Sequence, residues 1–206
     1  MTHRSLSAIG VLAFALALPV AASAQHGGRI DVPAAPSNLA VEEGNIPFLQ
    51  TRAYGTQNYI CSINTSVPAG VAWKLFGPQA TLYPQNAPMQ VATHFLSPNP
   101  EEYGTARATW MDSHDGSAVW AVAEQMSTDS NYVAPGAVAW LRLRKVGTAN
   151  GPIGGSMLAQ TTFIQRLNTE GGVAPATGCD NATKLGTTVL VPYSTDYFFY
   201  RAEKKN

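Results

Sequence analysis

Hydrophobic and polar residues alternate with a period of two along most of the chain. Within residues 137–146, Leu141 and Leu143 fall on one face of an extended chain, whereas Arg142 and Arg144 fall on the other. Side chains of a β-strand alternate in this way, so that one face packs on a core and the other meets solvent. The pattern predicts a half-buried strand.

Similar short runs recur, separated by turn residues and rich in β-branched and aromatic side chains, which favour strands. They cover residues 71–76, 90–96, 105–111, 117–126, 137–146, 157–167 and 189–201. Helical spacing is brief, at residues 100–103 and after Pro78. About eight strands with few short helices are typical of an antiparallel β-sandwich or a closed β-barrel. We expect an all-β protein with one of these two architectures.

A short positive start, an apolar run and a small-x-small site follow one another in residues 1–24. The run extends from Leu6 to Leu18, and Ala22 and Ala24 form the small positions of the site. These features are typical of a secretory signal peptide, here cleaved after Ala24. The run is short for a membrane span. The sequence therefore predicts an extracytoplasmic protein, in the periplasm or secreted, without a transmembrane segment in its mature form.

The rest of the chain divides into two parts. Residues 25–45 contain several Gly and Pro and little periodicity, which predicts a flexible lead-in. Residues 46–206 carry the predicted strands, and this length suits one domain with a core of its own. We expect a single β domain there.

The two cysteines of the chain, Cys61 and Cys179, both follow the predicted signal peptide. Thiols outside the cytoplasm tend to be oxidised, so we predict a disulfide between them. In the chain-entropy model, closing so long a loop removes about 4–5 kcal/mol of unfolded-state entropy. Two buried free thiols, or a metal-binding or catalytic cysteine, are the alternatives.

Composition narrows the list of partners and reactions. Charged residues make up 13% of the chain, with a formal net charge of zero, and no basic cluster precedes the terminal Lys204 and Lys205. Nucleic-acid binders need a basic surface, so we expect no nucleic-acid partner. The sequence also lacks a Gly-x-Gly-x-x-Gly turn, a phosphate-binding P-loop and a Gly-x-Ser-x-Gly elbow. We therefore expect no cofactor and no dehydrogenase activity.

The densest polar cluster is the segment Asp-Ser-His-Asp-Gly at residues 112–116. Asp112 and His114, with His94 from an earlier strand, are weak candidates for metal ligands. His94 with Asp112 or Asp115 has the side chains for acid–base catalysis. The alternatives are a turn that Asp115 caps through its side chain and a core histidine at position 94. We favour the turn and predict no metal site.

Two further residues are candidates for ligand binding. Trp110 immediately precedes the polar cluster, and aromatic side chains are used either as stacking platforms for ligands or, more often, as core. Arg166 can bind an anionic group bidentately, or it can pair with Glu170 or Asp196 and hold a loop. The ligand-binding candidates are His94, Trp110, Asp115 and Arg166. No residue is predicted to be catalytic.

A series of short motifs in fixed order extends over residues 38–201. The most specific are Phe163–Pro175 with Cys179, and Val191–Tyr200. Shorter ones include Tyr59-Ile60-Cys61, Trp73-Lys74-Leu75, His94-Phe95, Asp115-Gly116-Ser117 and Trp140-Leu141. Together they resemble the bacterial and fungal family known as domain of unknown function 3455. The resemblance implies an exported protein with no assigned reaction, and it carries over no catalytic residue.

The sequence thus favours an exported, non-catalytic β domain that binds a small molecule, a glycan or an envelope partner. Two alternatives remain open. One is a hydrolase-type enzyme, metal-assisted or acid–base, that uses His94 with Asp112 or Asp115. The other is a structural or stress-related envelope protein.

Overall fold

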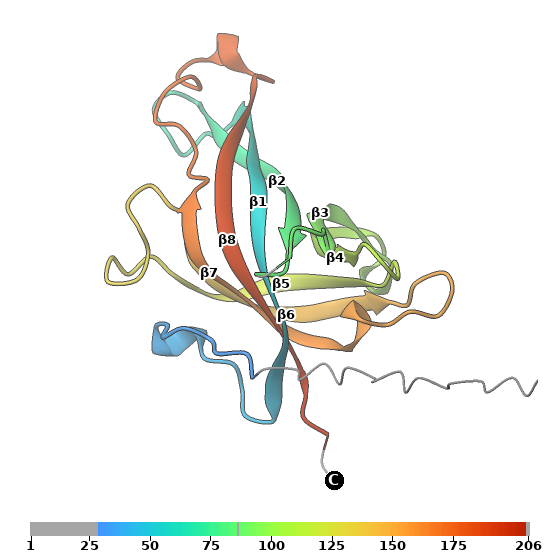
Figure 1. Cartoon of the computed structure of the whole chain (residues 1–206). Helices are drawn as coiled ribbons and strands as arrows, with labels where there is room; N and C mark the ends of the chain where they lie inside the picture. Colours follow the sequence, from blue (N-terminus) through green and yellow to red (C-terminus); the bar gives the residue numbers. More distant parts are fainter. Residues whose placement is uncertain (1–28, 86, 205–206) are drawn as a thin grey trace, which may run out of the picture.

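The strands of this protein each have one apolar face, and they pair edge to edge in a sheet whose last strand pairs with its first. In the computed structural model, which describes residues 29–85 and 87–204, each strand pairs with its neighbours in sequence and β8 closes onto β1 (Figure 1). The strands are β1 (Asn45–Ile63), β2 (Val71–Tyr83), β3 (Ala92–Asn99), β4 (Thr105–Asp112), β5 (Ala118–Ser127), β6 (Trp140–Ala149), β7 (Thr161–Gly171) and β8 (Thr188–Ala202). The prediction of about eight strands is confirmed, and the architecture is the closed barrel. The predicted signal peptide, residues 1–24, lies outside the described residues.

Helices are confined to single turns. They are η1 (Ser37–Leu39), η2 (Pro100–Glu102), η3 (Leu158–Gln160) and η4 (Ala182–Lys184). Among the described residues, none of the helices is long and apolar enough to cross a membrane.

The barrel closes along β1 and β8, which pair from Asn45↔Ala202 to Ile60↔Thr188. This is the longest seam of the sheet, and it pairs one edge of each of the two strands over that length. Gly55, in the middle of β1, sits where a Cβ atom would overlap the carbonyl oxygen of Gln79 on β2. Only a glycine allows so close an approach of the two backbones.

Alternation along the strands produces one core inside the barrel and another outside it. The inner core comprises Ala53, Ala80, Leu82, Ala92, Trp110, Val119, Ala121, Leu143, Leu158, Ile164, Tyr193, Tyr197 and Phe199. Leu158 of η3 is fully buried in this core and its backbone N–H donates to the Ser117 hydroxyl at 2.9 Å. The short helix therefore closes one end of the barrel.

The outer core is covered by the segment before β1. It comprises Leu39, Val133, Trp140, Phe163, Leu167, Phe198 and Tyr200, with Ile30, Val32 and Val41 packed against them. The Gln165 amide donates to the Leu39 carbonyl oxygen at 2.7 Å, and Leu39 is fully buried. Residues 30–41, which the sequence assigns to a flexible lead-in, therefore lie packed against the barrel wall.

The opposite end of the barrel is open because several strands separate there. β2 and β3 pair only at Ala80↔His94, Thr81↔Thr93 and Leu82↔Ala92. Beyond these pairs β2 continues along β1, whose other edge pairs with β8, and Figure 1 shows these three strands rising past the rest of the barrel. The wall is split between β2 and β3 at the open end.

A disulfide joins Cys61 near the end of β1 to Cys179 in the loop between β7 and β8, with the two Cα atoms 5.4 Å apart. This confirms the predicted pairing. The same loop is held by hydrogen bonds from the Cys61 N–H to the Thr187 carbonyl oxygen at 2.8 Å and from the Trp73 indole to the Thr177 carbonyl oxygen at 3.0 Å. The bond is compatible with an extracytoplasmic location.

A candidate ligand site in the open end of the barrel

A cavity of about 290 Å³ occupies the open end of the barrel. Its apolar lining includes Leu75, Leu96, Ala108, Ala121, Ala123, Leu141 and Leu143, and its polar lining includes Gln57, His94, Arg107, Trp110, Arg166 and Tyr197. All eight strands contribute residues to this lining. An eight-stranded barrel has room for side chains or for one small ligand, and here the small residues Ala108, Ala121 and Ala123 leave the space unfilled.

His94 lies at the centre of an aromatic stack. Its ring is parallel to that of Trp110, with centroids 4.0 Å apart and planes at 7°, and it meets the ring of Tyr197 edge-on at 5.4 Å. The two residues are brought together because His94 and Trp110 are directly paired across β3 and β4. His94 is buried, as the alternative of a core histidine at this position requires.

The protonation of His94 follows from its surroundings. Nδ1 lies 2.9 Å from the Thr109 carbonyl oxygen, which can only accept, so Nδ1 carries the proton and Nε2 is left as an acceptor. Burial, opposed by the hydrogen bond to Thr109 and assisted by the positive charge of Arg166, lowers the pKa of His94 to about 3. His94 is therefore a neutral imidazole over the physiological range.

Arg166 faces the cavity from β7, paired in register with Tyr197 on β8 and Leu141 on β6. Its Nε and Nη2 donate to the Ala139 carbonyl oxygen at 3.2 and 2.7 Å. No carboxylate among residues 29–85 and 87–204 forms an ion pair with it. The guanidinium is thus positioned by a backbone carbonyl and keeps its charge unpaired.

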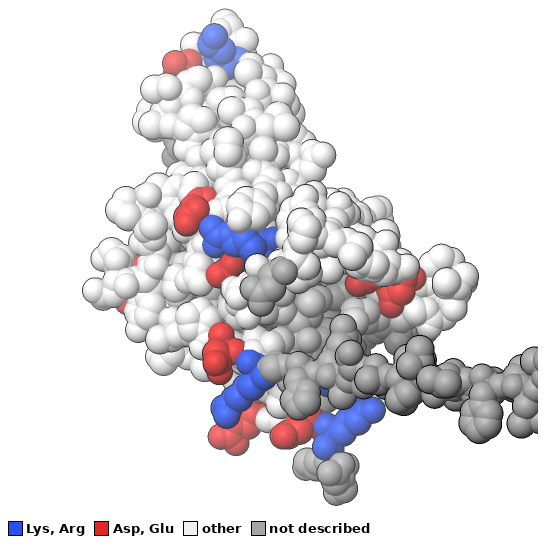
Figure 2. Space-filling view, in the orientation of Figure 1, with Lys and Arg blue, Asp and Glu red and all other residues white. Residues whose placement is uncertain are grey.

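The alternative in which Arg166 pairs with Glu170 or Asp196 is wrong. Arg52 of β1 takes both carboxylates, at 3.1 Å from Glu170 and 3.4 Å from Asp196. This group lies on the outer wall, and Figure 2 shows that charged side chains are sparse on the face in view. On β7, Glu170 therefore pairs with Arg52 on the outer wall, whereas Arg166 faces the cavity.

Three buried side-chain groups that line the cavity form no hydrogen bond of standard geometry within the described part of the chain. They are Gln57 Nε2, Trp110 Nε1 and the Tyr197 hydroxyl, and the Tyr193 hydroxyl beside Gln57 and Tyr197 is a fourth. Burial raises the pKa of both phenols, with Arg166 opposing the rise. These groups remain protonated and able to donate.

Sequence reasoning missed Gln57 and the roles of Tyr193 and Tyr197. The two tyrosines lie four residues apart in β8, a spacing that places both on one face of a strand, and this signal was available. No sequence signal pointed to Gln57, because a glutamine in a strand is expected on the surface until the pairing of β1 shows that it faces the interior.

Asp115 does not join the other ligand-binding candidates. It lies in the turn between β4 and β5, at the closed end, where its carboxylate accepts from the N–H groups of Ser117 at 2.7 Å and Met157 at 2.9 Å. Asp112 accepts from the N–H groups of His114 and Asp115, both at 2.8 Å. The turn interpretation of this segment accounts for both aspartates.

The geometry also separates the residues considered for metal binding or acid–base catalysis. His94 has no carboxylate at ion-pair distance among the described residues, whereas His114 Nδ1 lies 3.9 Å from Asp112. In the part of the chain that the structure describes, no three His, Cys, Asp or Glu side chains gather as a metal site. Neither Asp112 nor Asp115 orients His94.

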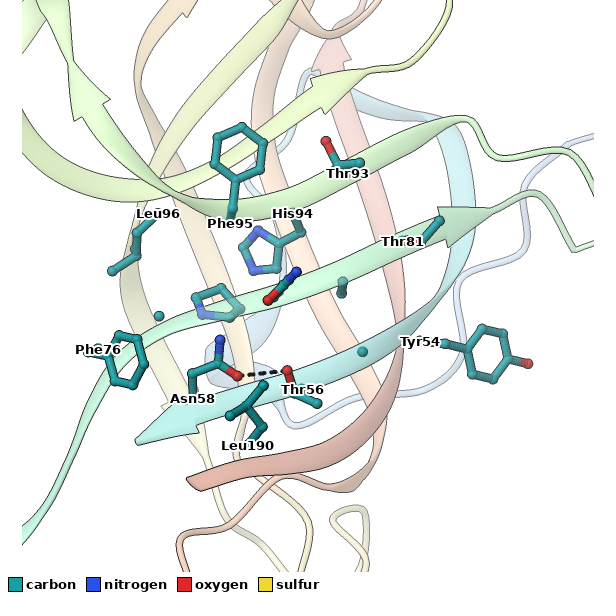
Figure 3. A pocket seen from close by; sticks show the side chains of 15 residues that line it. Tyr54, Thr56, Asn58, Phe76, Thr81, Thr93, His94, Phe95, Leu96 and Leu190 are labelled. Carbon is teal, nitrogen blue, oxygen red and sulfur yellow. Dashed lines mark hydrogen bonds between the residues drawn. The ribbon is translucent and has the colours of Figure 1, made fainter. Parts of the chain in front are cut away.

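A wider groove of about 850 Å³ runs along the outside of the split between β2 and β3. In Figure 3 the His94 ring lies between these two strands, and Leu96 and Phe76 flank the groove at one end. The Leu96 side chain contacts Gly77, where a Cβ atom would lie 3.1 Å from Leu96 Cγ. Leu96 and His94 line both the groove and the inner cavity, so the split connects the two.

The family model described as "Protein of unknown function (DUF3455)" matches residues 42–201. The chain belongs to this family. The DUF3455 match covers the barrel and every residue that lines the cavity, and it confirms the resemblance drawn from the short motifs. No curated protein and no solved structure matches the chain.

Proposed function

We propose that this protein is an exported, non-catalytic binding protein that holds a small molecule in the open end of its barrel. The observation that carries the proposal is the set of buried donors on Gln57, Trp110, Tyr193 and Tyr197 that have no partner among the described residues. A buried polar group left without a partner costs about 1–3 kcal/mol, and such groups in native proteins call for an explanation. A bound molecule supplies the missing acceptors.

The surroundings of the cavity support binding rather than catalysis. The one imidazole in it is neutral, stacked on Trp110 and tied to a backbone carbonyl through Nδ1. Acid–base catalysis works best when the pKa of the group lies near the working pH, and that of His94 is far below it. A mostly apolar pocket with a few convergent polar groups is the usual form of a small-molecule site.

The location part of the proposal is supported by two features. The first 24 residues have the pattern of a signal peptide, and the disulfide between Cys61 and Cys179 suits an oxidising compartment. We infer that the protein meets its ligand in the periplasm or the medium.

A thermal-shift screen of small molecules tests the binding proposal. Ala123→Phe fills the mouth of the cavity from an exposed position on β5, and Ala202→Phe is the matched control on an exposed alanine at the closed end of β8. A ligand at about 100 times its Kd stabilises the folded state by about 2.7 kcal/mol, which raises Tm by about 5–10 °C for a domain of this size.

We expect such a rise for the wild type and Ala202→Phe but not for Ala123→Phe. A screen in which no compound stabilises the wild type, or in which every active compound stabilises all three proteins equally, contradicts the proposal.

A further inference from the structure

Several side-chain donors line the cavity, and the side-chain acceptors there, such as His94 Nε2, are uncharged. Trp110 Nε1 and the Arg166 guanidinium can only donate, and Gln57 Nε2 is likewise a donor. The Tyr197 hydroxyl at the cavity, and the Tyr193 hydroxyl beside it, stay protonated because burial raises the pKa of each phenol. The cavity therefore presents a surplus of donors to whatever it binds.

The charge in the cavity has one sign. No Asp or Glu lines it. Of the two lining arginines, Arg107 is bound to Glu102 through two hydrogen bonds of 2.8 and 2.7 Å, while Arg166 has no carboxylate partner in residues 29–85 and 87–204. A half-buried cation without an opposite charge is unfavourable unless something pairs with it.

The Arg166 side chain is oriented for such a pairing. Nε and Nη2 share a single acceptor, the Ala139 carbonyl oxygen, so Nη1 takes no part in that contact. Tyr197, its register partner on β8, places an unpartnered hydroxyl near the guanidinium. An arginine fixed by a backbone carbonyl loses less side-chain entropy on binding an anion.

The remainder of the cavity is apolar and small. Leu75, Leu96, Leu141 and Leu143 line it together with four alanines, and its volume of about 290 Å³ lies at the lower end of the range for ligand pockets. An inorganic anion has no apolar surface to bury against this leucine lining. A carboxylate attached to a compact apolar group can pair with Arg166 and also bury its apolar part against the leucines.

Resting on the proposed function, we propose that the ligand is a small organic carboxylate whose acid group binds Arg166 with help from Tyr197 and Gln57. Its apolar part lies against Leu96 and Leu141 towards the mouth. The pairing forms charge-assisted hydrogen bonds to a guanidinium, which are the stronger kind. His94, neutral and stacked on Trp110, forms part of the wall and adds no second charge.

Calorimetric titration with matched acids and amides tests the charge assignment. The probes are benzoate and hexanoate, their neutral analogues benzamide and hexanamide, and inorganic phosphate, each added to the mature disulfide-bonded protein. We expect each carboxylate to bind at least tenfold more tightly than its amide, and phosphate to bind more weakly than either carboxylate.

Substitutions at Arg166 locate the effect. Arg166→Met is expected to weaken carboxylate binding at least tenfold and to change amide binding less than twofold, and Arg166→Lys to retain part of the preference. Arg201→Met, at the closed end of β8, is the control and keeps the preference intact. If Arg166→Met does not fold, the wild-type titration at low and high salt gives the same information, because only the carboxylate affinity falls with ionic strength.

The outcomes separate this inference from the proposed function. Equal affinities for acids and amides, both abolished by Ala123→Phe, overturn the charge assignment and leave the binding site in place. Phosphate binding more tightly than both carboxylates, or a preference for acids that survives Arg166→Met, also overturns it. If none of the probes binds, the inference is wrong, while the proposed function is judged by the thermal-shift screen alone.

Discussion

Burial of a neutral histidine makes stability depend on pH, and His94 gives a quantitative test of the barrel interior. The pKa of His94 is about 3 in the folded protein against 6.5 for a free histidine. Below pH 6.5 the unfolded chain takes up a proton at this position and the folded protein does not. The free energy of unfolding is therefore independent of His94 above about pH 6.5 and decreases as the pH falls from 6.5 towards 3.

Each pH unit in this window lowers the free energy of unfolding by about 1.36 kcal/mol. Between pH 7 and pH 4.5 the loss from His94 alone is about 2.7 kcal/mol. His94→Gln removes the titrating group and keeps an amide that can donate to the Thr109 carbonyl oxygen.

Urea unfolding at pH 7 and pH 4.5 measures the effect on the disulfide-bonded protein. We expect the wild type to lose about 2.7 kcal/mol more than His94→Gln between the two pH values, because the carboxylates contribute equally to both proteins. His114→Gln, at a half-exposed side chain in the turn, is the control and follows the wild type. The same pH dependence for the wild type and His94→Gln refutes the buried neutral histidine.

Three further predictions concern the scaffold and are read from urea unfolding at neutral pH. Replacing Cys61 and Cys179 by Ser opens a loop of 118 residues and lowers the free energy of unfolding by about 5 kcal/mol in the chain-entropy model. A loss below 1 kcal/mol contradicts the stabilisation that we assign to the disulfide. Gly55→Ala forces β1 away from β2 and costs about 1–3 kcal/mol, whereas an unchanged midpoint contradicts the close approach. Leu39→Ala empties the outer core at a cost of about 2–5 kcal/mol, and no cost means that residues 30–41 are not packed there.

The sequence predicts most strands because their alternation is local. β1 is the exception, because Pro47 and Gly55 interrupt its pattern and the buried Thr51 and Gln57 are polar. The choice between sandwich and barrel depends on the pairing of β1 with β8, the first and last strands. No short-range pattern encodes such a contact, so the sequence left both architectures open.

The candidate site was predictable only where its residues meet through local strand pairing. His94 and Trp110 meet because a single hairpin pairs β3 with β4, and strand alternation alone places both inward. Asp115 is close to Trp110 in sequence, but the intervening residues carry it to the far end of the barrel. The pairing of Arg166 with Glu170 failed because the register of β7 shifts between Leu167 and Glu170, where Asn168 adopts a φ of 50°. Asp196 is paired with Leu167, the neighbour of Arg166, and so lies on the opposite face of the sheet.

The central claim is that a ligand binds beside Trp110 inside the barrel, and the four indole N–H signals in a ¹H–¹⁵N spectrum test it most directly. Trp73 and Trp120 donate to Thr177 and Ser97, Trp140 belongs to the outer core, and only Trp110 among the four lines the cavity. When the most stabilising compound of the screen is added, the account predicts that the Trp110 signal shifts far more than the other three. A saturating compound that leaves the Trp110 signal in place contradicts the account.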